Sequence, residues 1–298
     1  MKKILSVMLV ALLALSLFAG CGPKAQEGVT VGSKQFTENI LLSEIYAQLI
    51  EAKTDIPVTR KLNLGGTSVC MPAMQNGEID IYFEYTGTAY NEILKLELTE
   101  DVSDEDIQKA CIEQLNADYG IKMFDPIGIN NTYALAIKTA RMDEFNISSI
   151  SELALLSSNL RFGAGHTFYT RIFDGYDGIV ETYGLHFTEA LKMDSSLLYE
   201  AVDKDELDII VVFSTDSLLK KYDMTVLEDD KHVFPPYQGA PMCLNSALEK
   251  YPELNDVLNT LSGKIDDTMM QDLNYEVDVN NRSVEDVAAE FLKSNGYV

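Results

Sequence analysis

The sequence predicts an α/β protein of two lobes, with a ligand cleft between them and two chain crossings that form a hinge. Strands and helices alternate as βαβαβ over residues 28–85, which is typical of a largely parallel sheet. A second alternating series begins near residue 133. The segments after residue 232 are amphipathic helices without a full sheet of their own, so we expect the chain to return and complete the first lobe.

The predicted crossings near residues 131 and 232 fix the domain organisation. Lobe 1 is predicted to comprise residues 29–131 and 232–298, and lobe 2 is predicted to comprise residues 132–231. Closure of the two lobes over a ligand is the motion that a two-segment hinge allows.

Each element of the first series has its own signal. In the first helix Leu41, Ile45 and Leu49 repeat every four residues, as on a buried helix face. Pro72 lies near the start of the next helix, where proline is tolerated. The series is predicted as strands at 29–32 and 57–64, a helix at 37–53, a helix opened by Gly65-Gly66-Thr67 and a strand that ends at Tyr85.

The second series and the C-terminal region are predicted in the same way. The most apolar strand of the chain is expected just before Phe213. The second series is predicted as strands at 133–137, 160–163 and 208–213, with helices at 149–156, through 197–202 and from about 215. The C-terminal helices are predicted at 243–250, 252–263, 266–272 and 283–295.

The two series share an internal echo. MQNGEIDIYFEYTGT and VDKDELDIIVVFSTD both run from a helix end through an acidic turn and an Asp to five strand residues and a small-residue turn. Counted from Asp80 and Asp208, Tyr85 and Phe213 occupy the same place. The echo predicts one aromatic residue at a strand end in each of two similar lobes.

The N-terminus predicts export. Two lysines precede an apolar run that ends in Ala-Gly-Cys21, which is typical of a signal peptide over residues 1–20. The run is shorter than the roughly 20 residues of a membrane-spanning helix. The end of the run is similar to the bacterial lipobox, so we expect Cys21 to carry a lipid and residues 21–28 to be a tether. The alternative is an ordinary signal peptide that ends by chance in a Cys.

Composition narrows the class of ligand. The formal net charge of −24 argues against nucleic acid, whose phosphates require basic patches. Cys70, Cys111 and Cys243 show no metal-ligand or disulfide spacing, so we expect three buried thiols and neither metal nor cofactor. We expect a monomer.

The turn Tyr85-Thr86-Gly87-Thr88 is the strongest candidate for a functional site. Ligands of open α/β sheets bind beyond the carboxyl ends of strands. No His, Cys or acid is aligned with this aromatic turn, which favours holding a ligand over cleaving one.

Several separated motifs resemble one family in the same order along the chain. The sequence is similar to the substrate-binding lipoproteins of ABC importers for quaternary-ammonium osmoprotectants (glycine betaine, choline and carnitine). The resemblance implies the type II periplasmic-binding-protein fold, an ABC permease with its ATPase as partner, and an extracytoplasmic protein anchored to the membrane. The motifs are GSKQFTE at 32–38, DIYFEYTGT at 80–88, NNTYAL at 130–135, FSTD at 213–216 and FPPYQGAP at 234–241.

The resemblance also implies site residues. In the family a tyrosine cage holds the trimethylammonium head, and polar groups hold the carboxylate. Phe213 departs from the tyrosine that is usual before STD. Arg171 is a candidate for an anionic tail, with a surface salt bridge as the alternative. The implied set is Tyr85, Tyr133, Phe213 and Tyr237 for the cage and Gln35, Thr88 and Arg171 for polar contacts.

The chemistry of the ligand agrees with such a cage. A quaternary ammonium has no N–H to donate, but aromatic faces attract its charge by about 0.5–2 kcal/mol each. The alternatives are a larger betaine such as ergothioneine in the same transport role, a sensory lipoprotein without transport, and an enzyme on the same scaffold. The enzyme would require an acid–base pair or nucleophile that the motif positions do not offer.

Overall fold

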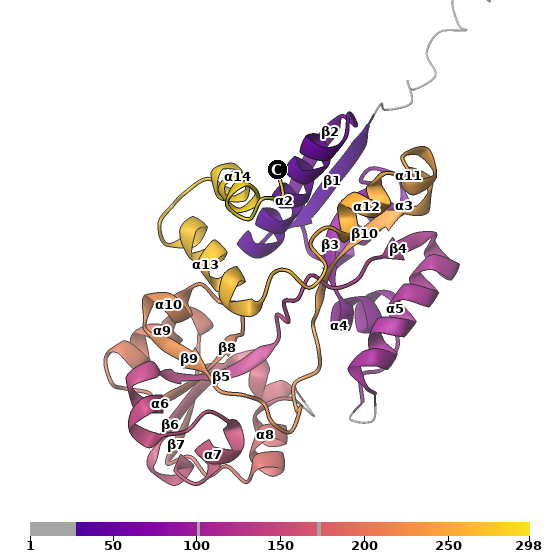
Figure 1. Ribbon diagram of the computed structural model, residues 1–298. Helices are drawn as coiled ribbons and strands as arrows, with labels where there is room; N and C mark the ends of the chain where they lie inside the picture. The colour runs from indigo at the N-terminus through magenta and orange to yellow at the C-terminus, as the bar shows by residue number, and fades with distance from the viewer. Residues whose placement is uncertain (1–27, 100–101, 172–173) are drawn as a thin grey trace, which may run out of the picture.

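The computed structural model describes residues 28–99, 102–171 and 174–298, which form two α/β lobes (Figure 1). Cys21 and the predicted signal peptide lie outside these residues. In the part of the chain described, no helix is long and apolar enough to cross a membrane.

Lobe 1 contains the N-terminal elements and those that follow the return of the chain. Its strands are β1 (Val29–Lys34), β2 (Val58–Gly65), β3 (Ile81–Tyr85), β4 (Ile121–Met123) and β10 (Gly239–Leu244). Its helices are α2 (Thr37–Lys53), α3 (Thr67–Gln75), α4 (Thr86–Thr88), a π-helical turn (Ala89–Ile93), α5 (Asp104–Tyr119), α11 (Asn245–Lys250), α12 (Leu254–Asn259), α13 (Asp267–Asp278) and α14 (Val284–Ser294).

Lobe 2 contains the middle of the chain. Its strands are β5 (Tyr133–Lys138), β6 (Arg161–Gly165), β7 (Glu189–Met193), β8 (Ile209–Phe213) and β9 (Met224–Val226). Its helices are α6 (Thr139–Phe145), α7 (Ile150–Ala154), α8 (Tyr176–Tyr183), α9 (Ser195–Asp203) and α10 (Leu218–Lys221), with short 3-10 turns at Ser157–Asn159 and His166–Thr170.

The sheets are mixed, whereas the sequence predicted largely parallel ones. Over the described residues the strand orders are β2-β1-β3-β10-β4 and β7-β6-β8-β5-β9. Strands β1, β2 and β3 are parallel, as are β6, β7 and β8. In contrast, β10 and β5, which follow the crossings, run antiparallel to both of their neighbours. Each enters its sheet from the opposite lobe, and this reverses its direction.

The echo seen in the sequence corresponds to repeated local structure. The Asp80 carboxylate accepts a hydrogen bond from the Thr30 N–H at 2.7 Å, and Asp208 accepts one from the Arg161 N–H at 2.8 Å. In each lobe the strand after this Asp ends at the aromatic residue and pairs with the crossing strand, with Tyr85 opposite Gly239 and Phe213 opposite Tyr133. The two aromatic residues therefore occupy equivalent strand ends.

The C-terminal helices differ from the prediction at several of their ends: α12 ends at Asn259 rather than at 263, and α13 continues to Asp278 rather than ending at 272. Residues 243–244 were predicted as the start of a helix, but they end β10, and α11 begins at Asn245. The helices α12, α13 and α14 follow, with Asp266 and Ser283 as N-caps of the last two. Helix α14 packs on α2, so the end of the chain completes lobe 1.

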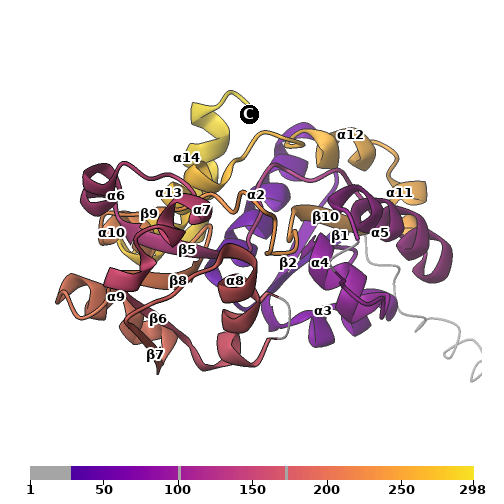
Figure 2. The same ribbon diagram turned by 90° about the horizontal axis from the view of Figure 1, so that it is seen from below.

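The two crossings lie side by side. Asn130 and Gln238 form an isolated antiparallel bridge, and the Asn131 N–H donates to the Tyr237 carbonyl at 3.1 Å. The return crossing extends beyond residue 232, since Phe234 still packs in the core of lobe 2. Figure 2 shows the two lobes from below.

Helix α13 provides a second connection between the lobes. Two of its side chains donate hydrogen bonds to the backbone of lobe 2. Gln271 Nε2 donates to the Ser214 carbonyl at 2.7 Å, and Asn274 Nδ2 donates to the Thr215 carbonyl at 3.0 Å. Lys220 of α10 pairs with Asp272 at 2.6 Å. A helix of lobe 1 thus holds the segment just after Phe213.

Asp267 at the start of α13 makes stability depend on pH. Its carboxylate accepts the Asn130 N–H at 2.7 Å. Burial and the Glu38 and Asp266 charges raise its pKa to about 6 from 3.8. A raised folded-state pKa means that ionisation destabilises the fold above pH 6, and that this penalty is lost as the pH falls towards 3.8.

We therefore expect Asp267→Asn, which keeps an acceptor for Asn130, to stabilise the protein at pH 7.5 by about 1 kcal/mol after allowance for partial solvent screening. The gain should shrink to nearly zero at pH 4. Urea unfolding of both proteins at the two pH values measures it. An equal gain at both values would exclude Asp267 ionisation as its cause.

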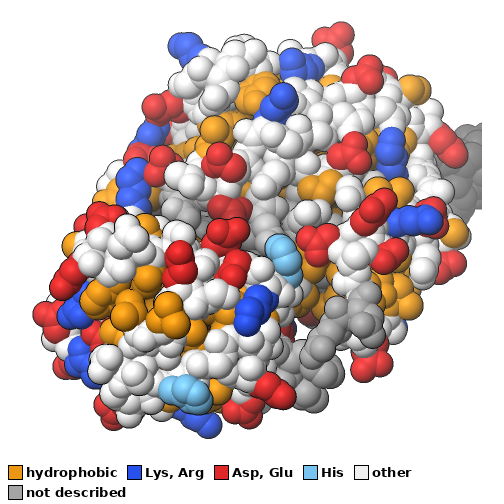
Figure 3. All heavy atoms as spheres, turned by 60° about the horizontal axis from the view of Figure 1, so that its bottom comes forward, with side chains coloured by type: hydrophobic (Ala, Val, Ile, Leu, Met, Phe, Trp, Pro, Cys, Tyr) orange, Lys and Arg blue, Asp and Glu red, His pale blue; other side chains and the backbone are white. Residues whose placement is uncertain are grey.

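The three predicted thiols are buried. Burial raises the pKa of Cys70 to about 11 and that of Cys111 to about 12, which makes both thiols unreactive. On the surface, acidic side chains are spread over the face shown in Figure 3, with basic ones isolated among them.

Candidate functional site

A cavity of about 430 Å³ lies between the lobes, at the ends of β3 and β8 and beside both crossings. Aromatic rings and two cationic side chains form most of its wall. The lining residues are Lys34, Phe36, Tyr85, Thr88, Asn131, Thr132, Tyr133, Arg171, Phe213 and Tyr237.

In lobe 1 the wall is built where β1 and β3 end. Tyr85 is the last residue of β3, and its ring packs against Phe36 with centroids 6.1 Å apart. Its hydroxyl donates to Glu38 Oε1 at 2.6 Å. Burial, followed by the Glu38 charge, raises the pKa of Tyr85 well above 10, so the phenol remains a donor. The ring is thereby fixed at both its face and its tip.

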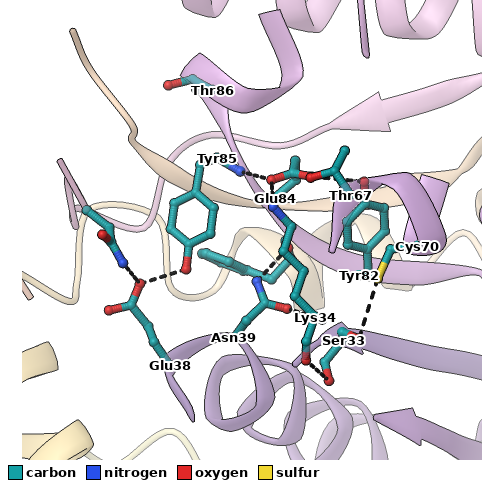
Figure 4. Close-up of polar contacts among 12 residues, drawn as sticks. Ser33, Lys34, Glu38, Asn39, Thr67, Cys70, Tyr82, Glu84, Tyr85 and Thr86 are labelled. Carbon is teal, nitrogen blue, oxygen red and sulfur yellow. Dashed lines mark hydrogen bonds and ion pairs between the residues drawn. The ribbon is translucent and has the colours of Figure 1, made fainter. Parts of the chain in front are cut away.

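A buried ion pair lies beside this ring. Lys34 Nζ pairs with Glu84, and the ammonium is 5.2 Å from the centroid of the Tyr85 ring (Figure 4). Glu84 also accepts from Thr67 Oγ1 at 3.0 Å and from the Tyr82 hydroxyl at 3.1 Å. These donors satisfy the lone pairs of the carboxylate that Lys34 leaves free. A buried ion pair requires such hydrogen bonds because both of its charges have lost their contact with water.

In lobe 2 an aromatic stack forms the opposite wall. Tyr133 and Phe213 are paired across β5 and β8, and their rings stack with centroids 4.9 Å apart. Phe168 and Tyr133 make a T-shaped contact, with ring centroids 5.4 Å apart. Phe213 is 48% exposed, which leaves much of its ring accessible.

Arg171 lies over the stack. Its guanidinium carbon is 5.0 Å from the centroid of the Tyr133 ring, and Nε donates to Asp174 at 2.8 Å. Although burial opposes the charged form, the Asp174 carboxylate raises the pKa of Arg171 above its ordinary value. The guanidinium is therefore a permanent cation at the cavity wall, held in place by its neighbour.

Tyr237 completes the wall from the return crossing. Its N–H donates to Asn130 Oδ1 at 2.7 Å. A Cβ placed on Gly87 would lie 2.9 Å from the Tyr237 ring and 2.6 Å from the Pro236 carbonyl oxygen. Only glycine therefore permits the turn after β3 to approach this ring so closely.

Six of the seven predicted site residues line this one cavity. Gln35 does not: it is exposed, and its two neighbours Lys34 and Phe36 line the wall instead. The residues that sequence reasoning missed are Lys34, Phe36, Asn131 and Thr132, all of which lie inside the motifs used for the prediction.

Two mixed α/β lobes joined by two crossings, with a cavity between them, define the class of two-lobed substrate-binding proteins. Residues 27–294 match the model of the substrate binding domain of ABC-type glycine betaine transport systems. The chain belongs to this family, and its members are substrate-binding proteins of ABC transporters, which work outside the cytoplasm.

Known relatives are similar over the whole chain. The carnitine transport binding protein OpuCC of Listeria monocytogenes is 32% identical, over 99% of this chain and 98% of the relative. The ergothioneine transport permease and binding protein EgtU of Helicobacter pylori is 37% identical over 98% of this chain, which spans 52% of that relative. A crystal structure described as a glycine betaine/carnitine/choline ABC transporter matches with a TM-score of 0.85, 33% identity, and coverage of 90% and 99% of the two chains.

These findings confirm the predicted fold class, family and role in transport. They leave the individual site residues, the lobe boundaries, the lipid anchor and the oligomeric state as predictions.

Proposed function

We propose that this protein captures a small betaine, with a trimethylammonium head and an anionic tail, between its lobes and delivers it to an ABC permease. The observation that carries the proposal is a single cavity lined by the rings of Tyr85, Tyr133, Phe213 and Tyr237 together with two cations. Aromatic faces attract a quaternary ammonium that hydrogen-bond acceptors cannot hold. Four rings at about 0.5–2 kcal/mol each supply much of the roughly 8 kcal/mol of a micromolar complex.

The anionic tail has its own partners. Lys34 and Arg171 enter the cavity from opposite lobes, and Thr88 adds a hydroxyl. A carboxylate between them would contact both lobes and favour closure, because it binds the closed form better than the open one. Choline has no such tail. The proposed site does not include Gln35.

A larger betaine is the second candidate. The relative named for ergothioneine is 37% identical to this chain, and ergothioneine carries the same trimethylammonium and carboxylate groups. We further propose that the protein acts as a monomer without catalysis, and that a lipid on Cys21 anchors it outside the cell membrane.

Calorimetric titration with glycine betaine, carnitine, ergothioneine and choline tests the proposed ligand class. We expect tight binding of at least one betaine and at least tenfold weaker binding of choline. If none of the four compounds binds, the ligand is not a quaternary ammonium, and the proposal is wrong.

Phe213 tests the departure from the tyrosine cage. Phe213→Tyr adds a hydroxyl to an exposed ring that already stacks on Tyr133, so the ring face available to the ammonium is unchanged. We expect the affinity for the betaine to change by less than tenfold in the same titration. A larger change would mean that a hydroxyl at this position takes part in binding.

A further inference from the structure

Glu38 is a buried carboxylate beside the cavity that has no cationic partner among the described residues. It lies in the first turn of α2 and is 3% exposed. Its oxygens accept from the Tyr85 hydroxyl at 2.6 Å, Asn131 Nδ2 at 2.8 Å and Asn274 Nδ2 at 3.2 Å. All three donors are neutral groups.

The other deeply buried acids of the described chain differ in this respect. Glu84, Glu44 and Asp174 are also more than nine-tenths buried, and they pair with Lys34, Arg60 and Arg171 respectively. An ion pair is the usual arrangement, since an isolated buried charge costs several kcal/mol. The positive end of α2 and three neutral donors make the Glu38 charge tolerable, but they do not neutralise it.

The charge balance around the cavity follows from these pairs. Lys34 is neutralised by Glu84, and Arg171 is neutralised by Asp174. Glu38 remains as an unbalanced negative charge. One of its three hydrogen bonds comes from the hydroxyl of Tyr85, whose ring lines the cavity. Asp267 adds to this negative field when it is ionised.

We infer that Glu38 is a positioning residue that selects a cationic head: it holds the Tyr85 ring in place and supplies negative charge that the ammonium of the ligand balances. A hydrogen bond from a phenol to a carboxylate increases electron density in the ring, which strengthens its attraction for a cation. The interior has a low dielectric constant, so water screens this charge weakly. The inference rests on the proposed function.

The same residue connects the cavity to the hinge. Asn131 lies in the first crossing, and Asn274 also donates to the Thr215 carbonyl of lobe 2 at 3.0 Å. One carboxylate therefore contacts a ring of the site, a crossing segment and the helix that bridges the lobes. A ligand that stabilises this charge also stabilises those contacts.

Glu38→Gln tests the inference because it removes the charge and keeps a side chain of the same shape. The ligands are the tightest-binding betaine of the panel and its tert-butyl analogue, in which carbon replaces the charged nitrogen. We expect the affinity for the betaine to fall at least tenfold and the affinity for the analogue to change by less than threefold. The melting temperature should change little, because the loss of an unbalanced buried charge is offset by the loss of one acceptor, since the new amide NH2 cannot accept from Asn274.

Glu44→Gln is the matched control, a buried acid on the same helix that pairs with Arg60 away from the cavity. It should lower the melting temperature and leave betaine affinity unchanged. Tyr85→Phe removes the same hydrogen bond from the other partner and keeps the ring. It should lower the affinity for the betaine at least threefold and leave the affinity for the analogue unchanged.

The outcomes separate the two proposals. If the wild-type protein binds no betaine, the proposed function fails, and the role of Glu38 fails with it. If the wild-type protein binds the betaine, two results would overturn only the role of Glu38. One is a Glu38→Gln variant with wild-type affinity, and the other is an equal fall in its affinities for the betaine and the analogue. A lower melting temperature with equal losses would indicate a purely structural residue.

Discussion

Tyr133→Ala is expected to weaken betaine binding at least a hundredfold. The ring is stacked on Phe213, makes a T-shaped contact with Phe168 and lies under the Arg171 guanidinium. Its removal deletes one aromatic face and also the support that orients a second ring and a cation. A direct loss of up to about 2 kcal/mol, together with loss of positioning, gives a total of about 3 kcal/mol. Calorimetric titration of the folded variant measures the loss.

The matched control is Tyr133→Phe, which retains the ring and its stacking. Tyr133 begins β5 at the cavity and is only partly buried, so neither change removes a central core residue. Tyr133→Phe should bind within about fivefold of wild type. Equal weakening in both variants would show that the hydroxyl rather than the ring is required.

Periodicity predicted the elements that present these rings, because the rings follow strongly patterned strands. The burial of four residues of β8 reflects the apolar run visible in the sequence, whereas the five buried residues of β3 include Glu84, whose burial depends on Lys34. The equivalent positions of Tyr85 and Phe213 followed from the internal echo alone. The pairing of Phe213 with Tyr133 did not, because it depends on the antiparallel entry of β5 into the sheet.

Lys34 shows why part of the site was missed. Strand β1 was predicted to end at Gly32, but it continues through Lys34. A charged residue after a strand is ordinarily solvated, and its burial here depends on Glu84, which lies 50 residues further along the chain. Gln35 was predicted from the GSKQF motif of the resembling family, whereas its neighbours Lys34 and Phe36 line the cavity. The burial of Lys34 beside the cavity depends on its tertiary ion pair with Glu84, which has no local signal in the sequence.

Strand β10 was missed for a related reason. It contains Gly239 and Pro241, both of which are unfavourable in strands. Gly239 is required because a Cβ there would lie 2.6 Å from the Phe83 ring. This constraint comes from the neighbouring strand β3 and has no local signal in the sequence.

Lys34→Met is expected to lower the free energy of unfolding by about 3 kcal/mol and to weaken betaine binding at least tenfold. The substitution leaves the Glu84 carboxylate fully buried without an opposite charge. It also removes one of the two cations proposed to hold the anionic tail. Urea unfolding and calorimetric titration measure the two effects separately.

The double variant Lys34→Met/Glu84→Gln distinguishes these two roles. Removing both charges eliminates the unpaired buried acid, and the amide oxygen introduced by Glu84→Gln can still accept from Thr67 or Tyr82, so most of the stability should return. Betaine affinity should remain low if Lys34 binds the tail directly. Recovery of affinity together with stability would mean that Lys34 serves only to neutralise Glu84, and the tail would then depend on Arg171 and Thr88.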